Sequence, residues 1–195
     1  GVLGAFTYST TGYEQTSIPG TKRTFPSKTT ITNTRHDCGV VSTWKPVPEH
    51  VQSQLLCPSG KALKVVAYQT TISFFGVSSG EDFACSGDSY IYKPGATAGQ
   101  VWNYQCKSAD AVAKQTAHVI GYSTMTVGAT AVRVLHISVA TTLSGADNGK
   151  STMDYWIATN KPVLLKETGS VQATQKGIDY QASYSLTLDS LTPKA

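Results

Sequence analysis

Charged residues and long apolar runs are both scarce in this chain of 195 residues. Asp, Glu, Lys and Arg make up only 14% of it, and no apolar run approaches the roughly 20 residues that a membrane-spanning helix needs. The 16 Lys and Arg residues are scattered, although the net charge is +4. A nucleic-acid surface is normally a dense basic patch. We therefore expect no transmembrane segment in this sequence and no nucleic-acid partner.

The common cofactor motifs are missing too. There is no Walker loop and no dinucleotide fingerprint. The cysteines form no C-x-x-C pair and lack histidines at zinc-finger spacing. The oxygen-rich loops at residues 79–82 and 147–149 do not have EF-hand spacing, and turn chemistry explains both. We expect no cofactor, no metal ion and no catalytic residue from these motifs.

Good helix formers are sparse, whereas Ser and Thr, at 20 and 26 residues, make up about a quarter of the chain. Alternation with a period of two residues is frequent, which predicts strands with one buried face. The clearest example is the segment 180–189, where mainly apolar residues alternate with polar ones. Tyr180, Ala182, Tyr184, Leu186 and Leu188 should face the core, and Gln181, Ser183, Ser185, Thr187 and Asp189 should face solvent.

Similar runs, bounded by turn residues, predict about 11–12 strands joined mainly by hairpins. Residues 21–35 are expected to form one strand with a bulge or edge position at Pro26. We place Pro46 and Pro48 in the turn between residues 39–45 and 51–57, and a further turn at residues 76–80. The fold class is therefore all-β, a single antiparallel meander that curls into a half-barrel or barrel with little helix. Residues 1–195 form one domain, in which residues 76–108 are a candidate disulfide-bearing flap.

The four cysteines, Cys38, Cys57, Cys85 and Cys106, are even in number and allow three pairings. Cys38 and Cys57 lie at similar distances from the centre of one predicted hairpin, and Cys85 and Cys106 flank another loop. We expect these two local disulfides and hence an extracytoplasmic protein, secreted or anchored to the cell envelope. The chain begins at Gly1 without Met, which we interpret as a mature form whose signal or anchor has been removed.

Acidic and histidine residues give two candidate constellations. Asp154 and Glu167 lie six residues before and seven residues after Asn160, at the centre of a predicted hairpin. If they were opposed, they would suit a glycosidase, which needs two carboxylates about 5–10 Å apart. His118 and His136 lie on consecutive predicted strands and are candidates for a metal site or a general base. The favoured interpretation is a solvated strand position for the two carboxylates and a half-buried polar residue for the two histidines.

The aromatic residues are spread over many predicted strands. We interpret them mainly as core, with a lining for an apolar or sugar ligand as the alternative. They are Tyr8, Tyr13, Tyr68, Phe74, Phe75, Tyr90, Tyr92, Trp102, Tyr104 and Trp156.

One hairpin has a recognisable pattern. The sequence from Asp154 to Glu167, DYWIATNKPVLLKE, resembles the D-x-W, short turn, x-P, apolar strand, E hairpin of the LolA/LolB-like family of cell-envelope β half-barrels. The similarity covers roughly residues 150–190. It implies a curved antiparallel sheet whose concave apolar face accepts acyl chains. The chain has no predicted covering helix and has a region with four cysteines, so no individual binding residue is transferred.

Together these features favour a non-catalytic binding or scaffold domain outside the cytoplasm. An apolar or lipid-like small molecule on the concave sheet face is the candidate ligand, as in a lipoprotein carrier. The alternative is an extracellular hydrolase that acts on glycans or peptides through Asp154 and Glu167. An open apolar groove would favour ligand binding, whereas a filled interior would favour a scaffold.

Overall fold

The computed structural model describes residues 2–74 and 77–194, and in these ranges the protein is all-β without helix. Its strands are β1 (Gly4–Thr16), β2 (Arg23–Thr24), β3 (Lys28–His36), β4 (Gly39–Val47), β5 (His50–Ser59), β6 (Ala62–Phe74), β7 (Val77–Gly87), β8 (Tyr90–Tyr92), β9 (Val101–Lys107), β10 (Ala111–Val127), β11 (Thr130–Gly145), β12 (Asp147–Ala158), β13 (Leu164–Gln175) and β14 (Ile178–Leu188). This part of the chain contains no helix long and apolar enough to cross a membrane.

The strands form a closed antiparallel barrel, so the expected curled meander is confirmed. Neighbours in the sheet follow the chain order with two exceptions. Strand β7 pairs with β9 because β8 lies beside β6, and β1 pairs with β3 as well as with the short strand β2. The first and last strands close the barrel through a register that runs from Tyr8 opposite Leu188 to Thr16 opposite Tyr180. Closure removes the two exposed edges that an open sheet would have.

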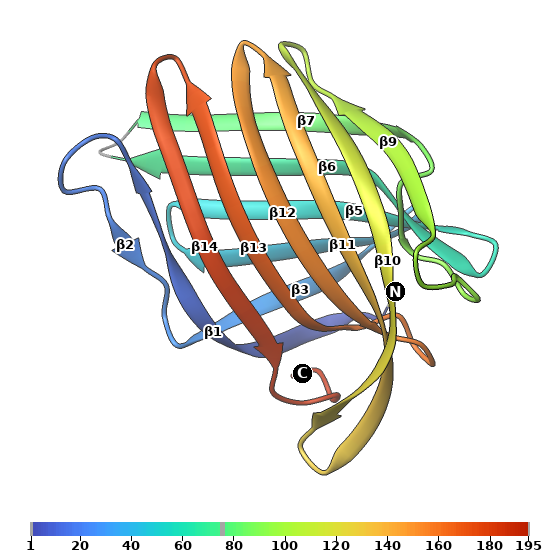
Figure 1. Ribbon diagram of the computed structural model, residues 1–195. Helices are drawn as coiled ribbons and strands as arrows, with labels where there is room; N and C mark the ends of the chain where they lie inside the picture. Colours follow the sequence, from blue (N-terminus) through green and yellow to red (C-terminus); the bar gives the residue numbers. More distant parts are fainter. Residues whose placement is uncertain (1, 75–76, 195) are drawn as a thin grey trace.

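The barrel is flattened into two walls. Figure 1 shows strands β10–β14 running steeply across strands β3–β7, which lie behind them. Inward side chains from both walls fill the space between them, including Trp44 from one wall and Leu186 from the other. On β14 the predicted alternation is confirmed: the inward residues Ala182, Tyr184, Leu186 and Leu188 are all buried.

Three predicted boundaries are wrong. The segment 21–35 is split, because Phe25, Pro26 and Ser27 separate β2 from β3 and Pro26 has no N–H for a strand ladder. Pro46 lies within β4, at a register shift between Trp44 and Val47, and only Pro48 lies in the turn. The predicted turn at 76–80 lies partly outside the described residues, and its last four residues, 77–80, belong to β7.

The proposed flap, residues 76–108, is mainly barrel wall. Strands β7 and β9 pair with each other and with β6 and β10. Only the segment between β7 and β9, which includes β8, lies off the strand path. The Gly and Ser content that suggested a flap is compatible with a strand here, since Gly80, for example, is directly opposite Thr71 in the β6–β7 ladder.

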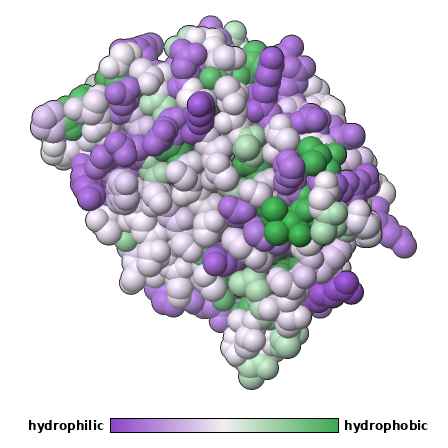
Figure 2. All heavy atoms as spheres, viewed as in Figure 1, coloured by the Kyte–Doolittle hydropathy of each residue, from purple (hydrophilic) through white to green (hydrophobic). Residues whose placement is uncertain are grey.

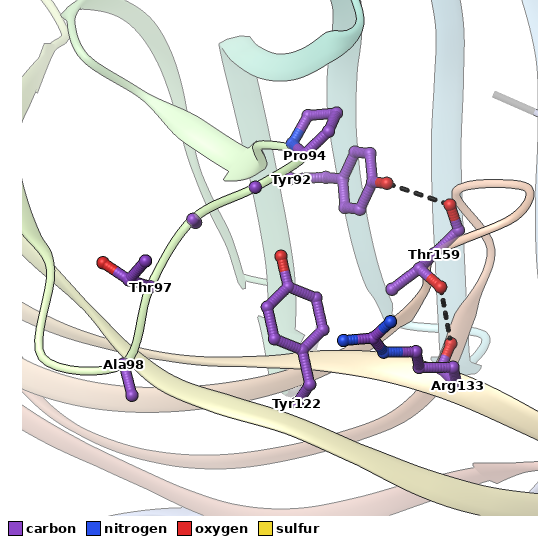
Figure 3. A pocket seen from close by; sticks show the side chains of 9 residues that line it. Tyr92, Pro94, Thr97, Ala98, Tyr122, Arg133 and Thr159 are labelled. Carbon is purple, nitrogen blue, oxygen red and sulfur yellow. Dashed lines mark hydrogen bonds between the residues drawn. The ribbon is translucent and has the colours of Figure 1, made fainter.

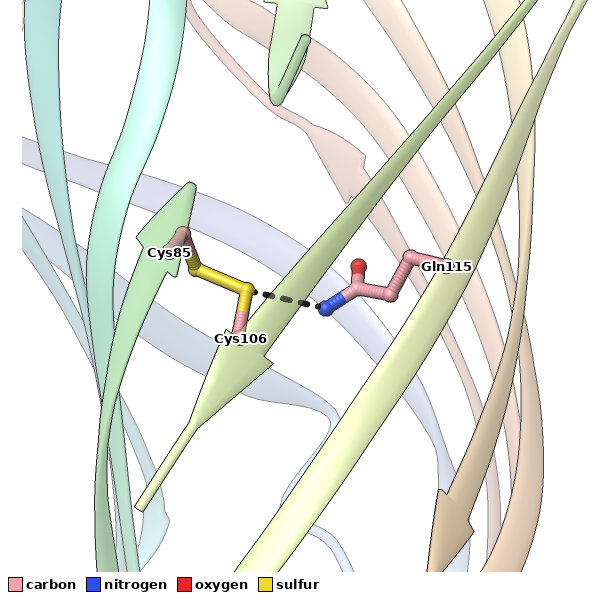
Figure 4. The surroundings of a disulfide bond; sticks show 3 residues. All are labelled: Cys85, Cys106 and Gln115. Carbon is pink, nitrogen blue, oxygen red and sulfur yellow. Dashed lines mark hydrogen bonds between the residues drawn. A yellow bond between two sulfur atoms is a disulfide. The ribbon is translucent and has the colours of Figure 1, made fainter. Parts of the chain in front are cut away.

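Two disulfides reinforce one half of the barrel. Cys38 is bonded to Cys57, and Cys85 to Cys106, which are the pairs expected from the sequence. Cys85 and Cys106 are directly opposed on β7 and β9. In Figure 4 the amide of Gln115, from β10, donates to Cys106 Sγ at 3.3 Å. Disulfides form and persist in oxidising compartments, so two of them are typical of a protein outside the cytoplasm.

Candidate functional site

The candidate carboxylate pair is not formed, because its two members lie on opposite sides of the barrel wall. In the β12–β13 register Asp154 is opposite Thr168, whereas Glu167 is opposite Tyr155. Directly opposed residues share a face and consecutive residues alternate, so Glu167 points inward with Tyr155 while Asp154 points outward. A register shift after Trp156, where Leu165 is the extra residue, causes the offset. The two-carboxylate hydrolase hypothesis is therefore wrong.

Asp154 instead belongs to a small cluster on the outer wall. Its Oδ1 lies 2.8 Å from His136 Nε2. The His136 ring stacks on Trp156 with ring centroids 4.1 Å apart, and Lys166 Nζ lies 4.6 Å from the centre of the Trp156 ring. His118 is exposed one row away, opposite Ser138. Nowhere in the described ranges do three His, Cys, Asp or Glu side chains converge as a metal site.

Glu167 lies inside the barrel, where its carboxyl group accepts a hydrogen bond of 2.7 Å from the Tyr184 hydroxyl. Burial raises the pKa of Glu167 to about 7, although the Tyr184 hydrogen bond acts in the opposite direction. Burial also raises the pKa of Tyr184, with the Glu167 charge as a further cause. A buried carboxyl group with one neutral partner favours its uncharged form.

Two glycines make room for the Tyr184 side chain. Gly12 and Gly169 are the residues directly opposite Tyr184 on β1 and β13. A Cβ atom at Gly169 would come within contact of the Tyr184 ring, and one at Gly12 would meet the Tyr184 backbone. The ring therefore lies over Gly169, and this position brings its hydroxyl to Glu167, two residues earlier on β13.

Glu167 borders a small space between the two walls, which we call the interior cavity. Its volume is about 70 Å³, and Trp44, Gln52 and Gln54 line it from one wall while Tyr155 and Glu167 line it from the other. A water molecule takes about 30 Å³ of liquid volume, so the cavity has room for about two. Sites for organic ligands are typically about 300–1,000 Å³. This cavity is therefore smaller than a typical site for an organic ligand.

A second buried glutamate, Glu14 on β1, has charged partners. Its Oε2 lies 2.7 Å from His50 Nδ1 and accepts a hydrogen bond of 2.9 Å from the Tyr180 hydroxyl. Its Oε1 lies 2.6 Å from an Arg23 guanidinium nitrogen. Burial by itself would raise the pKa of Glu14, but His50, Tyr180 and Arg23 together hold it below its ordinary value. Glu14 is therefore a buried carboxylate ion.

An aromatic layer separates the two glutamates. The Trp44 ring lies 6.1 Å from the His50 ring and 4.7 Å from the Tyr184 ring, measured between centroids. Phe25 packs edge-on against Trp44 at 5.6 Å. Neither Glu14 nor His50 lines the interior cavity. The Glu14 network consequently has the chemistry of a buried ionic cluster that is set apart from the interior cavity.

A larger hollow lies on the outside of the barrel, and we call it the outer groove. Its volume is about 520 Å³ and it is lined by Tyr92, residues 94–98, Tyr122, Arg133 and Thr159. Figure 3 shows the Arg133 guanidinium beside the Tyr122 ring, with the Tyr92 phenol above it. The guanidinium carbon lies 4.7 Å from the ring centre of Tyr122. The Tyr92 hydroxyl donates to the Thr159 carbonyl at 3.0 Å.

The rest of the outer wall is mostly hydroxyl-bearing. Figure 2 shows a face of largely neutral hydropathy, crossed by hydrophilic side chains and interrupted by small hydrophobic areas. Two exposed apolar residues, Val101 and Ile120, belong to β9 and β10. Ile120 is unpaired at the register shift between Val119 and Gly121, so the bulge turns its side chain to solvent.

The aromatic residues considered as a ligand lining are divided between the two sides of the wall, so they form no single surface. Tyr8, Tyr92 and Trp102 are buried, whereas Trp156 lies on the outer wall. Phe75 lies outside the described residues. Sequence reasoning missed Glu14 and the outer groove. The alternation of β1 does give a signal for Glu14, because Phe6, Tyr8, Thr10 and Glu14 share the inward face.

No family model matches the chain, and no curated protein matches it. Among solved structures, the hypothetical lipoprotein YmcC from Escherichia coli (K12) is similar, with a TM-score of 0.40 and 9% sequence identity. That similarity covers 90% of this chain and 85% of the YmcC chain. At this level it provides no functional information.

Proposed function

We propose that this protein is a non-catalytic binding or scaffold protein, secreted or anchored to the cell envelope, that acts through the outside of its barrel. The observation that supports this proposal is the filled interior, whose cavity of about 70 Å³ is too small for an organic ligand. The two disulfides agree with an oxidising compartment.

The interior also argues against the lipid carrier that the LolA/LolB-like resemblance implies. An acyl chain needs a continuous apolar channel. Here Trp44, Tyr184 and Leu186 from the two walls occupy one contiguous core. The nearest polar groups, Glu167 and the two glutamines, border a space for only about two water molecules. An apolar ligand on the concave face is therefore not part of the proposal.

Native mass spectrometry of protein purified from its own host tests the proposal. We expect the mass of the disulfide-bonded chain alone, and no rise in fluorescence when the protein is mixed with an apolar dye. A matched extraction into organic solvent should release no lipid in stoichiometric amount. One bound apolar molecule per chain would overturn the proposal, because it would require an interior that opens.

A variant test addresses the absence of catalysis. Glu167→Gln and Asp154→Asn each remove one carboxylate while they preserve side-chain size. We expect both folded variants to keep the protein's biological activity, since one residue is core and the other is on the outer wall. Loss of activity in a folded variant of either residue would reinstate a chemical role for that carboxylate.

A further inference from the structure

We propose that the outer groove binds a small organic anion. The acidic group of the ligand pairs with the Arg133 guanidinium, and its apolar body lies on the floor formed by residues 94–98. This inference rests on the proposed function, because it identifies the part of the outer surface that binds and the chemical class that it binds.

The charge of the groove is positive and uncompensated. In the described parts of the chain, the Arg133 guanidinium makes no ion pair within 4.0 Å and no hydrogen bond to a protein acceptor. None of the residues that line the groove is acidic. A guanidinium group presents five donors in a planar fork that matches a carboxylate or a phosphate.

Arg133 is held in position although it lacks an anionic partner. Its guanidinium carbon lies over the Tyr122 ring, 4.7 Å from the ring centre. Its N–H groups, which donate to no protein acceptor in the described residues, stay available for a ligand. The Arg133 backbone is also fixed, since its carbonyl oxygen accepts bonds from the Thr159 N–H at 3.0 Å and the Thr159 hydroxyl at 3.2 Å. Such preorganisation lowers the entropic cost of binding.

The floor of the groove is equally well fixed. Ala96 is buried, with 3% of its surface exposed. The loop is bonded to β10 through the Gly99 N–H and the Val119 carbonyl at 2.8 Å, and closed on itself through the Gln100 N–H and the Thr97 carbonyl at 3.0 Å. Tyr92 attaches it to the β12–β13 turn. Four separate parts of the chain thus converge on one preformed hollow.

The lining and size of the groove indicate an organic ligand rather than a bare ion. Pro94, Gly95, Ala96 and Ala98 present small apolar groups, and Tyr92 and Tyr122 add aromatic walls. The volume of about 520 Å³ lies in the range of sites for small organic molecules. An inorganic anion would use Arg133 and leave this apolar surface uncovered.

Titrations followed by ¹⁵N–¹H NMR test the inference with benzoate, its neutral analogue benzamide, phenyl phosphate and inorganic phosphate. We expect benzoate to shift the amide signals of residues 95–99 and 121–122 with a saturable isotherm. Benzamide should bind at least ten-fold more weakly. Binding of phenyl phosphate at least as tight as that of benzoate would identify a phosphate monoester as the natural acidic group, and weaker binding would identify a carboxylate. Either order supports an organic anion.

Arg133→Gln should weaken benzoate binding at least ten-fold, and Arg133→Lys should have an intermediate effect because the charge remains but the fork is lost. Arg35→Gln, at another exposed arginine on β3, is the matched control and should bind like the parent chain. Equal binding of benzoate and benzamide, equal binding of phenyl phosphate and inorganic phosphate, or no saturable shift in the folded protein would each overturn the inference. None of these results concerns a ligand inside the barrel. The inference about the groove can therefore fail while the proposed function stands, and native mass spectrometry tests the proposed function on its own.

Discussion

Two glutamates inside the same barrel have opposite charge states. Glu14 on β1 and Glu167 on β13 both point inward, and each accepts a hydrogen bond from a tyrosine of the intervening strand β14, Tyr180 and Tyr184 respectively. Only Glu14 also contacts the Arg23 guanidinium and the His50 ring. The pKa is below its ordinary value for Glu14 and is raised to about 7 for Glu167.

The comparison shows that burial alone does not determine the charge of a carboxyl group. Burial disfavours the charged form at both positions, and a tyrosine hydroxyl offsets part of that effect at both. The ion pair with Arg23 and the contact with His50 make the difference at Glu14. A buried carboxylate therefore depends on its partners, whereas a buried neutral carboxyl group can be replaced by an amide.

The largest expected effect is that of Glu14→Gln. Removing this carboxylate leaves the Arg23 charge with only Glu49, at 3.6 Å, and takes the partner away from buried His50. Breaking a buried pair by removing one member typically costs about 3–5 kcal/mol. Denaturant unfolding at pH 7 should show a loss of this size. A loss below about 1 kcal/mol would mean that the network contributes little and would remove the contrast with Glu167.

The next effect is a pH-dependent gain of stability in Glu167→Gln. The folded pKa of about 7 exceeds the unfolded value, so the folded state binds the proton more tightly. The stability contributed by this proton is present below about pH 4.3 and is lost as the pH rises through about 7. The Gln variant lacks this loss. Above pH 7 the stability that the parent loses, and the variant keeps, should be on the order of 3 kcal/mol.

The difference in the free energy of unfolding between the parent chain and Glu167→Gln is measured by denaturant unfolding between pH 4 and pH 8. The two free energies should diverge as the pH rises, with the variant the more stable at pH 8. The stability difference between the parent chain and Glu14→Gln should depend on pH in the opposite direction. The stability that Glu14 contributes is lost as the pH falls through its lowered folded pKa. Parallel curves for the Glu167 pair would show that the pKa of Glu167 is the same in the folded and unfolded states, and would contradict the comparison.

Gly169→Ala should destabilise the protein by about 2 kcal/mol. The added Cβ would overlap the Tyr184 ring, and overpacking in a core typically costs about 1–3 kcal/mol. The displaced ring would also lose its hydrogen bond to Glu167. Gly177→Ala is not a suitable control because its φ of +79° is left-handed, so Ala173→Gly on the same strand serves instead. Unchanged Tyr184 near-ultraviolet dichroism in Gly169→Ala would contradict the packing argument.

The smallest effect belongs to Asp154→Asn on the outer wall. The Asp154 and His136 side chains are 27% and 21% exposed, and pairs open to solvent contribute about 0–1 kcal/mol. We expect a stability change below about 1 kcal/mol in denaturant unfolding at pH 6. A loss close to that of Glu14→Gln would show that the outer cluster is a second buried network.

The strands and their faces could largely be predicted, but the closure of the barrel and the register of its hairpins could not. Alternation in segments such as 180–188 reports which residues share a face, and the structure confirms it. Alternation does not report which edges meet, so β1–β14 pairing is invisible in the sequence. A single extra residue, Leu165, changed the register of the β12–β13 hairpin and separated Asp154 from Glu167. The outer groove combines residues from four distant segments, none of which has a motif of its own.

Closure between the first and last strands also has a consequence for folding. The pairs that complete the barrel join residues as far apart as Ser9 and Asp189, which are 180 positions apart and hydrogen-bonded. Contacts of such high sequence separation form slowly, since much of the chain must be ordered first. Until β14 docks, β1 and β13 each present an unpaired edge that can join another chain. In the folded barrel β14 pairs with both β1 and β13, so neither edge is exposed. The risk of aggregation is therefore greatest between synthesis and the docking of the last strand.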